Sequence, residues 1–212
     1  MKDSSRNIYN ELFERYPALT GNKESVLSAF ELLKATFENG RSLFCGGNGG
    51  SSSDSEHIVG ELLKSFKKCR AIDEKTAKNL ANYGEDGEYL LSKLEGALPA
   101  TSLISQTGVL TAFANDKSWD AAMAQQLYGL GRAGDCLLVL STSGNSKNCV
   151  YAALVAKAKG IQTIAFTGRT GGKLKDVCDV TICVPEMETY KIQELHLPVY
   201  HCLCAMLEEE MF

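Results

Sequence analysis

The sequence predicts an α/β fold: a single three-layer domain in which a five-stranded parallel sheet carries helices on both faces. The chain has 212 residues and is 44% hydrophobic, which is enough for one sizeable core. Five short apolar runs, each bounded by Gly, Ser, Thr or Asp, follow Arg41: RSLFCGG, TSLISQT, DCLLVLST, QTIAFTG and DVTICVP. Helical stretches lie between most of these runs, and such alternation is typical of parallel strands joined by crossover helices.

Two helices are expected before the sheet. Residues 4–39 carry apolar side chains at helical spacing, the pattern breaks at Tyr16-Pro17, and Asn39-Gly40 ends it. We therefore expect residues 1–40 to form helices that pack on the core and residues 41–212 to form the domain itself. The polar segment 67–98 fits the alternation poorly and is interpreted as an insertion. The stretches SWDAAMAQQLYGLGRA and NSKNCVYAALVAKAKG predict helices between strands, and a last helix is expected from about Glu188 to Phe212.

Composition excludes several classes of protein. The balance of 22 basic against 26 acidic residues has no block of like charge, which argues against a nucleic-acid or membrane surface. The N-terminus has no apolar run of signal-peptide type, and no 18 consecutive residues are apolar, so we expect a cytoplasmic protein. The eight cysteines are scattered without a C-x-x-C pair, which favours buried thiols over disulfides or a cysteine zinc site.

Two loops rich in Gly, Ser and Asn connect strands to helices. GGNGGSSS follows the strand SLFC, and STSGNS follows the strand CLLVL. Ligands of such sheets bind at the carboxyl ends of the strands, and free N–H groups at helix starts suit a phosphate. Helix capping alone also explains Ser and Gly here, but two such loops in one sheet favour an anion site. No complete G-x-G-x-x-G, G-x-x-x-x-G-K-[ST] or G-x-S-x-G motif occurs, so we expect a phosphorylated small molecule and no nucleotide cofactor.

The ionisable residues suggest what happens to that molecule. His57 and Glu61 are four residues apart on one helix face, and Gln193, His196 and His201 lie on the last helix. A carboxylate and an imidazole beside a sugar phosphate could move a proton between adjacent carbons, which is aldose–ketose isomerisation through an enediol. The same groups are normal zinc ligands. Gln193 and His201 are eight residues apart, about 12 Å along a straight helix, so either Pro198 bends that helix or different subunits complete one site.

Five stretches in this order, GGNGGS, HxxxE, ND, STSGNS and IQExHxxxxH, resemble the sugar isomerase (SIS) fold and, within it, the phosphoheptose isomerases. Those enzymes interconvert sedoheptulose 7-phosphate and D-glycero-D-manno-heptose 7-phosphate, and the resemblance covers about Arg41 to the C-terminus. It implies a homotetramer with sites at subunit contacts, one zinc ion per site, and Glu61 and His201 as the acid–base pair. The implied zinc ligands are His57, Glu61, Gln193 and His201. The implied substrate-binding residues are Asn48, Gly49, Gly50, Ser51, Glu61, Asn115, Asp116, Ser141, Thr142, Ser143, Ser146 and Gln193.

The chain departs from the family pattern in two places. Lys64-Ser65 stands where the family has Gly-Arg, and the segment from Glu61 to Asn115 is longer, mostly through residues 67–98. Lys64, Lys67 or Lys68 could replace the charge but not the bidentate reach of an arginine. Both departures concern the choice of sugar more than the chemistry. The alternative function is a non-catalytic protein of the same fold that binds sugar phosphates or a replication initiator, and the presence of both Glu61 and His201 argues against it.

Overall fold

The computed structural model describes residues 1–212 and confirms the predicted α/β fold. Five parallel strands form one sheet in the order β2-β1-β3-β4-β5. The strands are β1 (Leu43–Gly47), β2 (Ala100–Ser102), β3 (Cys136–Leu140), β4 (Gln162–Thr167) and β5 (Val180–Cys183). Each falls within or beside one of the five apolar runs, although the edge strand β2 has only three residues.

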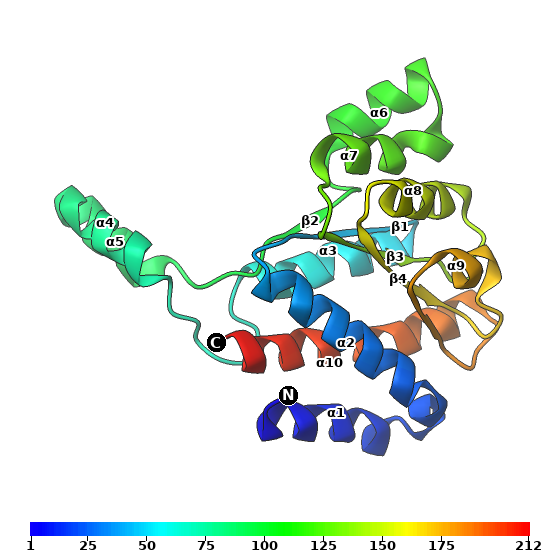
Figure 1. Cartoon of the computed structure of the whole chain (residues 1–212), viewed down its shortest axis with the longest axis horizontal. Helices are drawn as coiled ribbons and strands as arrows, with labels where there is room; N and C mark the ends of the chain where they lie inside the picture. The colour runs from blue at the N-terminus through cyan, green and yellow to red at the C-terminus, as the bar shows by residue number, and fades with distance from the viewer.

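Helices cover both faces of this sheet (Figure 1). They are α1 (Asp3–Arg15), α2 (Lys23–Glu38), α3 (Gly50–Leu63), α4 (Glu74–Leu80), α5 (Gly84–Lys93), α6 (Thr107–Asp116), α7 (Ala122–Leu130), α8 (Lys147–Ala158), α9 (Gly172–Val177) and α10 (Thr189–Met211). Three short 3₁₀ helices, η1 (Pro17–Asn22), η2 (Ala81–Tyr83) and η3 (Trp119–Ala121), join some of them.

Alternation along the strands divides the core into two parts. On β3, Leu138 and Leu140 belong to a core with α1, α2, α3 and α10, whereas Leu137 and Val139 belong to a second core with α7, α8 and α9. This is the period of two expected of strands that are buried on both faces. The two cores contain 29 and 14 buried residues, so the side that holds α3 and α10 is the larger.

The N-terminal helices share that larger core with the rest of the chain. Leu12 and Phe13 of α1 and Phe30 and Leu33 of α2 are buried in it, and both helices pack against α10. The helix α10 itself continues through Pro198 without interruption.

The division of the chain at residue 40, into N-terminal helices and a domain, remains a prediction.

The polar segment 67–98 forms a helical hairpin, α4 and α5, that extends away from the sheet (Figure 1). None of the residues of α4 is buried, and Gly87 is the only buried residue of α5. Across the whole chain, no helix is both long and apolar enough to cross a membrane.

Candidate active site

The two loops predicted to bind an anion meet at the carboxyl edge of the sheet. Asn48, directly after β1, exchanges two hydrogen bonds with Asn148 in the first turn of α8. The Asn48 amide donates to Asn148 Oδ1 over 2.9 Å, and the Asn148 amide donates to Asn48 Oδ1 over 2.7 Å. Because β1 and β3 are adjacent and parallel, this reciprocal pair fixes the start of α3 beside the start of α8.

Glycine is required in both loops for steric reasons. A Cβ atom on Gly47 would lie 2.4 Å from the Ser51 carbonyl oxygen, and one on Gly144 would lie 1.9 Å from the Gly171 carbonyl oxygen. Gly144 also has a φ of +66°, a backbone conformation that residues with a Cβ rarely adopt. Bare backbone therefore lets neighbouring segments approach closely here.

Neither helix that starts at these loops has a side-chain N-cap. Gly49 precedes α3 and Ser146 precedes α8, and neither makes a capping hydrogen bond. The Ser146 hydroxyl instead accepts from the Ser141 hydroxyl over 3.0 Å, while Ser143 is exposed and Thr142 is half-buried. The N–H groups of Ser51, Ser52, Ser53 and Cys149 already have acceptors within the chain. The remaining N–H groups at the two helix starts, together with these hydroxyls, form a set of donors suited to a phosphate.

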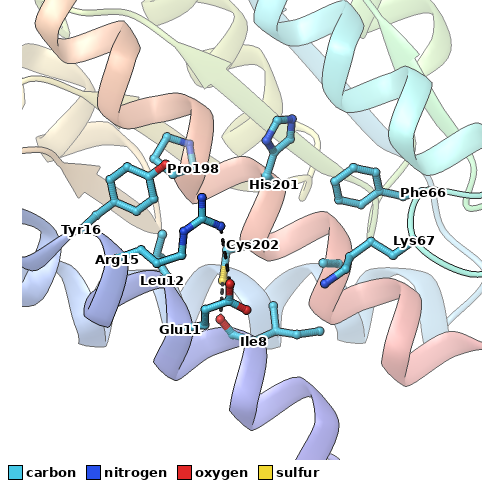
Figure 2. A pocket seen from close by; sticks show the side chains of 11 residues that line it. Ile8, Glu11, Leu12, Arg15, Tyr16, Phe66, Lys67, Pro198, His201 and Cys202 are labelled. Atoms are coloured by element: carbon cyan, nitrogen blue, oxygen red, sulfur yellow. Dashed lines mark hydrogen bonds and ion pairs between the residues drawn. The ribbon is translucent and has the colours of Figure 1, made fainter.

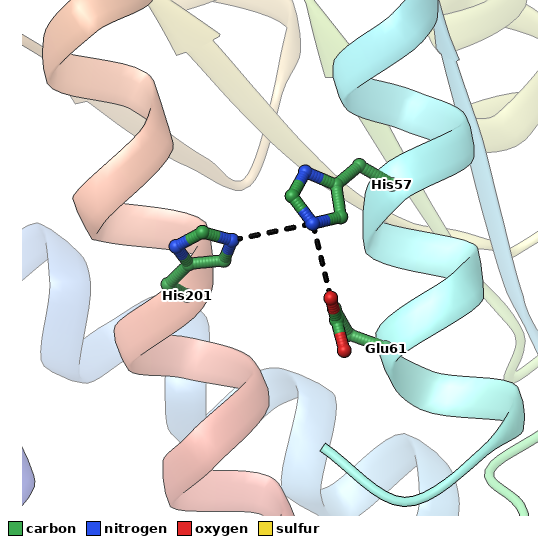
Figure 3. Close-up of side chains that lie close together, drawn as sticks. All are labelled: His57, Glu61 and His201. Carbon is green, nitrogen blue, oxygen red and sulfur yellow. Dashed lines mark hydrogen bonds and ion pairs between the residues drawn. The ribbon is translucent and has the colours of Figure 1, made fainter. Parts of the chain in front are cut away.

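Three ionisable side chains meet between α3 and α10 (Figure 3). His57 Nε2 lies 3.0 Å from Glu61 Oε1, as expected for positions four residues apart on one helix. His201 approaches from α10, with its Nε2 3.4 Å from that of His57. One ligand atom from each residue lies within 4.8 Å of the others, so the three side chains can hold one metal ion.

The surroundings of His201 and Glu61 bear on what this group can bind. Burial lowers the pKa of His201 below its ordinary value, and His57 lowers it further, while Glu61 acts in the opposite direction. Glu61 Oε2 is buried and accepts no hydrogen bond. The nearest cation, the Lys64 ammonium, is 3.7 Å away on a side chain that is 65% exposed. An orphaned carboxylate oxygen beside two imidazole nitrogens fits the donor set of zinc.

Sequence reasoning missed two residues behind His57. The buried Tyr200 hydroxyl lies 3.0 Å from His57 Nδ1 and donates to Asp54 Oδ1 over 3.3 Å. Burial, together with the charge of Asp54, raises the pKa of the Tyr200 phenol well above its ordinary value, so the phenol keeps its proton. Asp54 is three residues before His57 on α3, and that spacing was the available signal.

Several predicted site residues lie elsewhere. Gln193 is two turns before His201 on α10, and its amide donates to Ser51 Oγ over 3.4 Å beside Gly50. Asn115 and Asp116 are exposed at the end of α6, which packs against α7 and η3. His196 is fully buried, with Nε2 3.2 Å from the Thr167 carbonyl oxygen, and has a structural environment.

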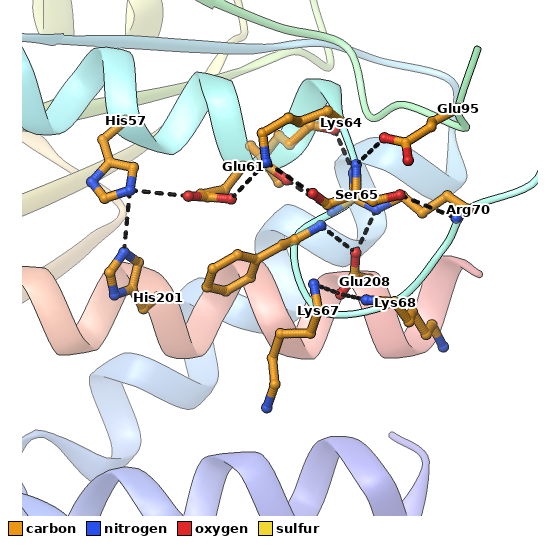
Figure 4. A network of polar contacts seen from close by, with 12 residues as sticks. His57, Glu61, Lys64, Ser65, Lys67, Lys68, Arg70, Glu95, His201 and Glu208 are labelled. Carbon is orange, nitrogen blue, oxygen red and sulfur yellow. Dashed lines mark hydrogen bonds and ion pairs between the residues drawn. The ribbon is translucent and has the colours of Figure 1, made fainter. Parts of the chain in front are cut away.

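A buried ion pair holds the end of α3 against α10 (Figure 4). Arg70 donates to Glu208 Oε1 over 2.7 Å and to the carbonyl oxygens of Glu61 and Leu62, which are among the last of α3. Arg70 thus caps the helix that carries Glu61.

The lysines near the missing family arginine have different surroundings. Lys68 pairs with Glu209 over 3.4 Å, and the Lys64 ammonium donates to the Ser65 carbonyl oxygen over 2.9 Å. Lys67 lines a pocket between α1 and α10 that also contains His201 and Phe66 (Figure 2). Of these lysines, Lys67 is therefore the one that shares a pocket with a member of the ionisable group.

Comparison with known proteins agrees with this arrangement. The SIS domain family matches residues 91–168. The chain is 34% identical to the phosphoheptose isomerase of Akkermansia muciniphila over 212 residues, which covers 100% of this chain and 99% of that protein. It is 36% identical to the phosphoheptose isomerase of Sulfurimonas denitrificans over 215 residues, covering 100% and 97% of the two chains.

A solved structure extends the comparison to three dimensions. The phosphoheptose isomerase of Neisseria gonorrhoeae superposes with a TM-score of 0.72 at 31% identity, over 97% of this chain and 93% of that one. Fold, sequence and the convergence of three ionisable side chains therefore agree, and the activity class they support is phosphosugar isomerisation. The chain belongs to the phosphoheptose isomerase family, the phosphosugar isomerases built on the SIS domain.

Proposed function

We propose that this enzyme interconverts sedoheptulose 7-phosphate and D-glycero-D-manno-heptose 7-phosphate through an enediol. The observation that carries the proposal is the convergence of Glu61, His57 and His201 in one group between α3 and α10. The names of the relatives, which are phosphoheptose isomerases, support a heptose phosphate as the substrate.

Glu61 and His201 divide the proton transfers between them. In the direction from ketose to aldose, the Glu61 carboxylate takes the proton from C1 and returns it to C2. His201 delivers a proton to O2 and takes one from O1, so one proton moves between the carbons and one between the oxygens. Burial lowers the pKa of His201, which favours the neutral imidazole; its N–H supplies the proton to O2 and is restored by the proton from O1.

The same group of side chains would hold a zinc ion. His57, Glu61 and His201 supply two imidazole nitrogens and a carboxylate, which leaves the coordination of a four-ligand ion incomplete. A bound zinc ion supplies Lewis-acid polarisation of the sugar oxygens. Gln193 was expected as a further ligand, and that expectation remains a prediction.

The phosphate would bind at the two loops. The first loop and the first turn of α3 contain Asn48, Gly49, Gly50 and Ser51. The second loop offers hydroxyl and N–H groups at the start of α8, and its residues are Ser141, Thr142, Ser143 and Ser146. Both helix starts direct free N–H groups and a positive dipole end toward an anion.

The spacing of these parts favours an oligomer. Glu61 follows Ser51 by ten residues, about 15 Å along α3, so the phosphate loops and the acid–base pair of one chain are far apart. We propose a homotetramer in which neighbouring chains complete each site, with Asn115, Asp116 and Gln193 as further substrate contacts.

Proton NMR of sedoheptulose 7-phosphate in D₂O tests the reaction. Deuterium at C1 together with the aldose product is expected with the zinc-loaded enzyme, and chelation is expected to abolish both. The variant Glu61→Gln should lose turnover while keeping its fold and its affinity for the sugar phosphate.

Glu56→Gln is the matched control, because Glu56 is an exposed carboxylate on the same helix. Full activity of Glu61→Gln would contradict the role of Glu61. Absence of exchange in the zinc-loaded enzyme, followed by turnover of another phosphosugar, would contradict the heptose substrate alone.

A further inference from the structure

A chain of hydrogen bonds runs from the ionisable group into the protein through Tyr200. His57 Nδ1 faces the Tyr200 hydroxyl at 3.0 Å, and that hydroxyl faces Asp54 Oδ1 at 3.3 Å. Tyr200 is only 1% exposed, so its hydroxyl is shielded from bulk water. Asp54 and His57 come from α3, whereas Tyr200 comes from α10.

The direction of these hydrogen bonds follows from the protons available. Burial raises the pKa of Asp54 above its ordinary value, while the Tyr200 hydrogen bond and His57 act in the opposite direction. A phenol has one proton and an ionised carboxylate can only accept, so with Asp54 ionised the Tyr200 proton is directed to it. The Tyr200 oxygen is then an acceptor toward His57, which favours the imidazole hydrogen on Nδ1. In a neutral imidazole this leaves Nε2 with a lone pair.

Nε2 is directed into the ionisable group, where the Glu61 carboxylate, which can also only accept, competes with the Tyr200 oxygen for the imidazole hydrogen. His57 Nε2 lies 3.0 Å from Glu61 Oε1 and 3.4 Å from His201 Nε2. The opposite tautomer would place a hydrogen on Nε2, where a metal ion has to bind. Outer partners that fix the tautomer of a ligating histidine commonly raise its affinity for metal.

We propose that Asp54 and Tyr200 are positioning residues that hold His57 as the Nδ1–H tautomer, leaving Nε2 free to bind a divalent cation. The inference rests on the proposed zinc site. Its direct consequence, the position of the imidazole hydrogen, is a property of the metal-free protein.

Two variants act on the hydrogen-bond chain in different ways. Tyr200→Phe keeps the buried ring and removes the acceptor, which releases His57 to either tautomer. Asp54→Ala removes the acceptor of the phenol proton, which then turns to His57 Nδ1 and favours the Nε2–H form. We expect each variant to weaken zinc binding by about 10- to 100-fold, and the loss of affinity in Asp54→Ala should be at least as large as that in Tyr200→Phe.

The double variant tests the direction of the chain. In the Tyr200→Phe background no phenol proton remains to be turned, so adding Asp54→Ala should weaken zinc binding little further. Tyr9→Phe is the control, because Tyr9 donates to the Lys23 carbonyl oxygen in another part of the chain. It should leave zinc affinity unchanged.

Zinc affinity is measured by competition with a chromophoric chelator, and the tautomer by ¹⁵N NMR of histidine-labelled, metal-free protein. The three histidines make the spectrum assignable with His196→Gln and His201→Gln. At a pH where imidazole is neutral, we expect a larger share of the Nδ1–H form of His57 in the wild type than in Asp54→Ala, where the Nε2–H form should predominate.

An equal share of the Nδ1–H form in the wild type and in Asp54→Ala would overturn the proposal. So would zinc affinities of Tyr200→Phe and Asp54→Ala within twofold of the wild type. Because the NMR experiment needs neither sugar nor metal, its result is independent of whether the heptose proposal holds.

Discussion

The buried pair Arg70–Glu208 gives the sharpest test of how the two site helices are held together. Both side chains are almost completely buried, at 0% and 1% exposure. Glu208 also accepts hydrogen bonds from the backbone N–H groups of Phe66, Lys67 and Lys68. Burial raises the pKa of Glu208, but these donors and Arg70 outweigh it and lower the pKa overall. The carboxylate is therefore ionised in the folded protein.

Removing one partner leaves a buried charge without its counter-ion. Loss of one member of such a pair typically costs about 3–5 kcal/mol. We expect about 3 kcal/mol for Arg70→Met, near the lower limit, because three N–H groups still stabilise Glu208. Glu208→Gln should also destabilise the protein, because it leaves the Arg70 guanidinium buried with only carbonyl oxygens.

The double variant should be more stable than the sum of the two losses predicts. With Arg70→Met and Glu208→Gln together no charge is buried, and the one oxygen of the glutamine can still accept from part of the backbone N–H groups, such as those of Lys67 and Lys68. We expect a coupling of about 1–3 kcal/mol in a double-mutant cycle of urea unfolding. Lys68→Met, which breaks the more exposed pair with Glu209, should cost less than about 1 kcal/mol. Additive losses, or a cost below about 1 kcal/mol for Arg70→Met, would refute this reasoning.

Three further predictions concern stability and substrate affinity. Burial lowers the pKa of His196 to about 4. Between pH 6.5 and 4 the unfolded chain takes up a proton that the native state does not. The free energy of unfolding should therefore fall by about 3 kcal/mol over this range, and urea titrations of His196→Gln should show a flatter dependence. Gly144→Ala should lower the free energy of unfolding by about 3 kcal/mol or more, because its Cβ would collide with Gly171. Gly40→Ala has a similar φ but open space around it, so it should lower the free energy of unfolding by only about 1–2 kcal/mol in urea titrations. Thr142→Val should raise KM by about tenfold with little change in kcat, and an unchanged KM would exclude the Thr142 hydroxyl from phosphate binding.

The parts of the fold that bury apolar side chains could be predicted from the sequence. The strands of the sheet centre have continuous apolar runs, and α1, α2, α7 and α8 have helical spacing. The hairpin of α4 and α5 could not be predicted in this way, because it buries almost nothing and so has no apolar pattern to show. The helix α6 was missed for a related reason, since Leu110 is its only buried residue.

The site was predictable where its geometry is local. The spacing of His57 and Glu61 places them on one face of a helix whatever the rest of the chain does. Lys64-Ser65 in place of Gly-Arg drew attention to a missing arginine, but the sequence could not show that Arg70 is committed to Glu208, 138 residues away. The hydrogen bond of Tyr200 to Asp54, which are 146 residues apart in the sequence, could not be predicted either.

What joins the local parts is the contact between α3 and α10. His201 and Glu208 are seven residues apart, about two helical turns, so one face of α10 presents both the imidazole and the carboxylate to α3. On α3, Asp54, His57 and Glu61 follow the same rule with spacings of three and four. The ion pair at one end and the hydrogen-bond chain at the other therefore act on the same helix contact. Loosening either end should disturb the ionisable group between them, and this explains why a charged pair is retained where a well-packed apolar pair could stabilise the fold as well.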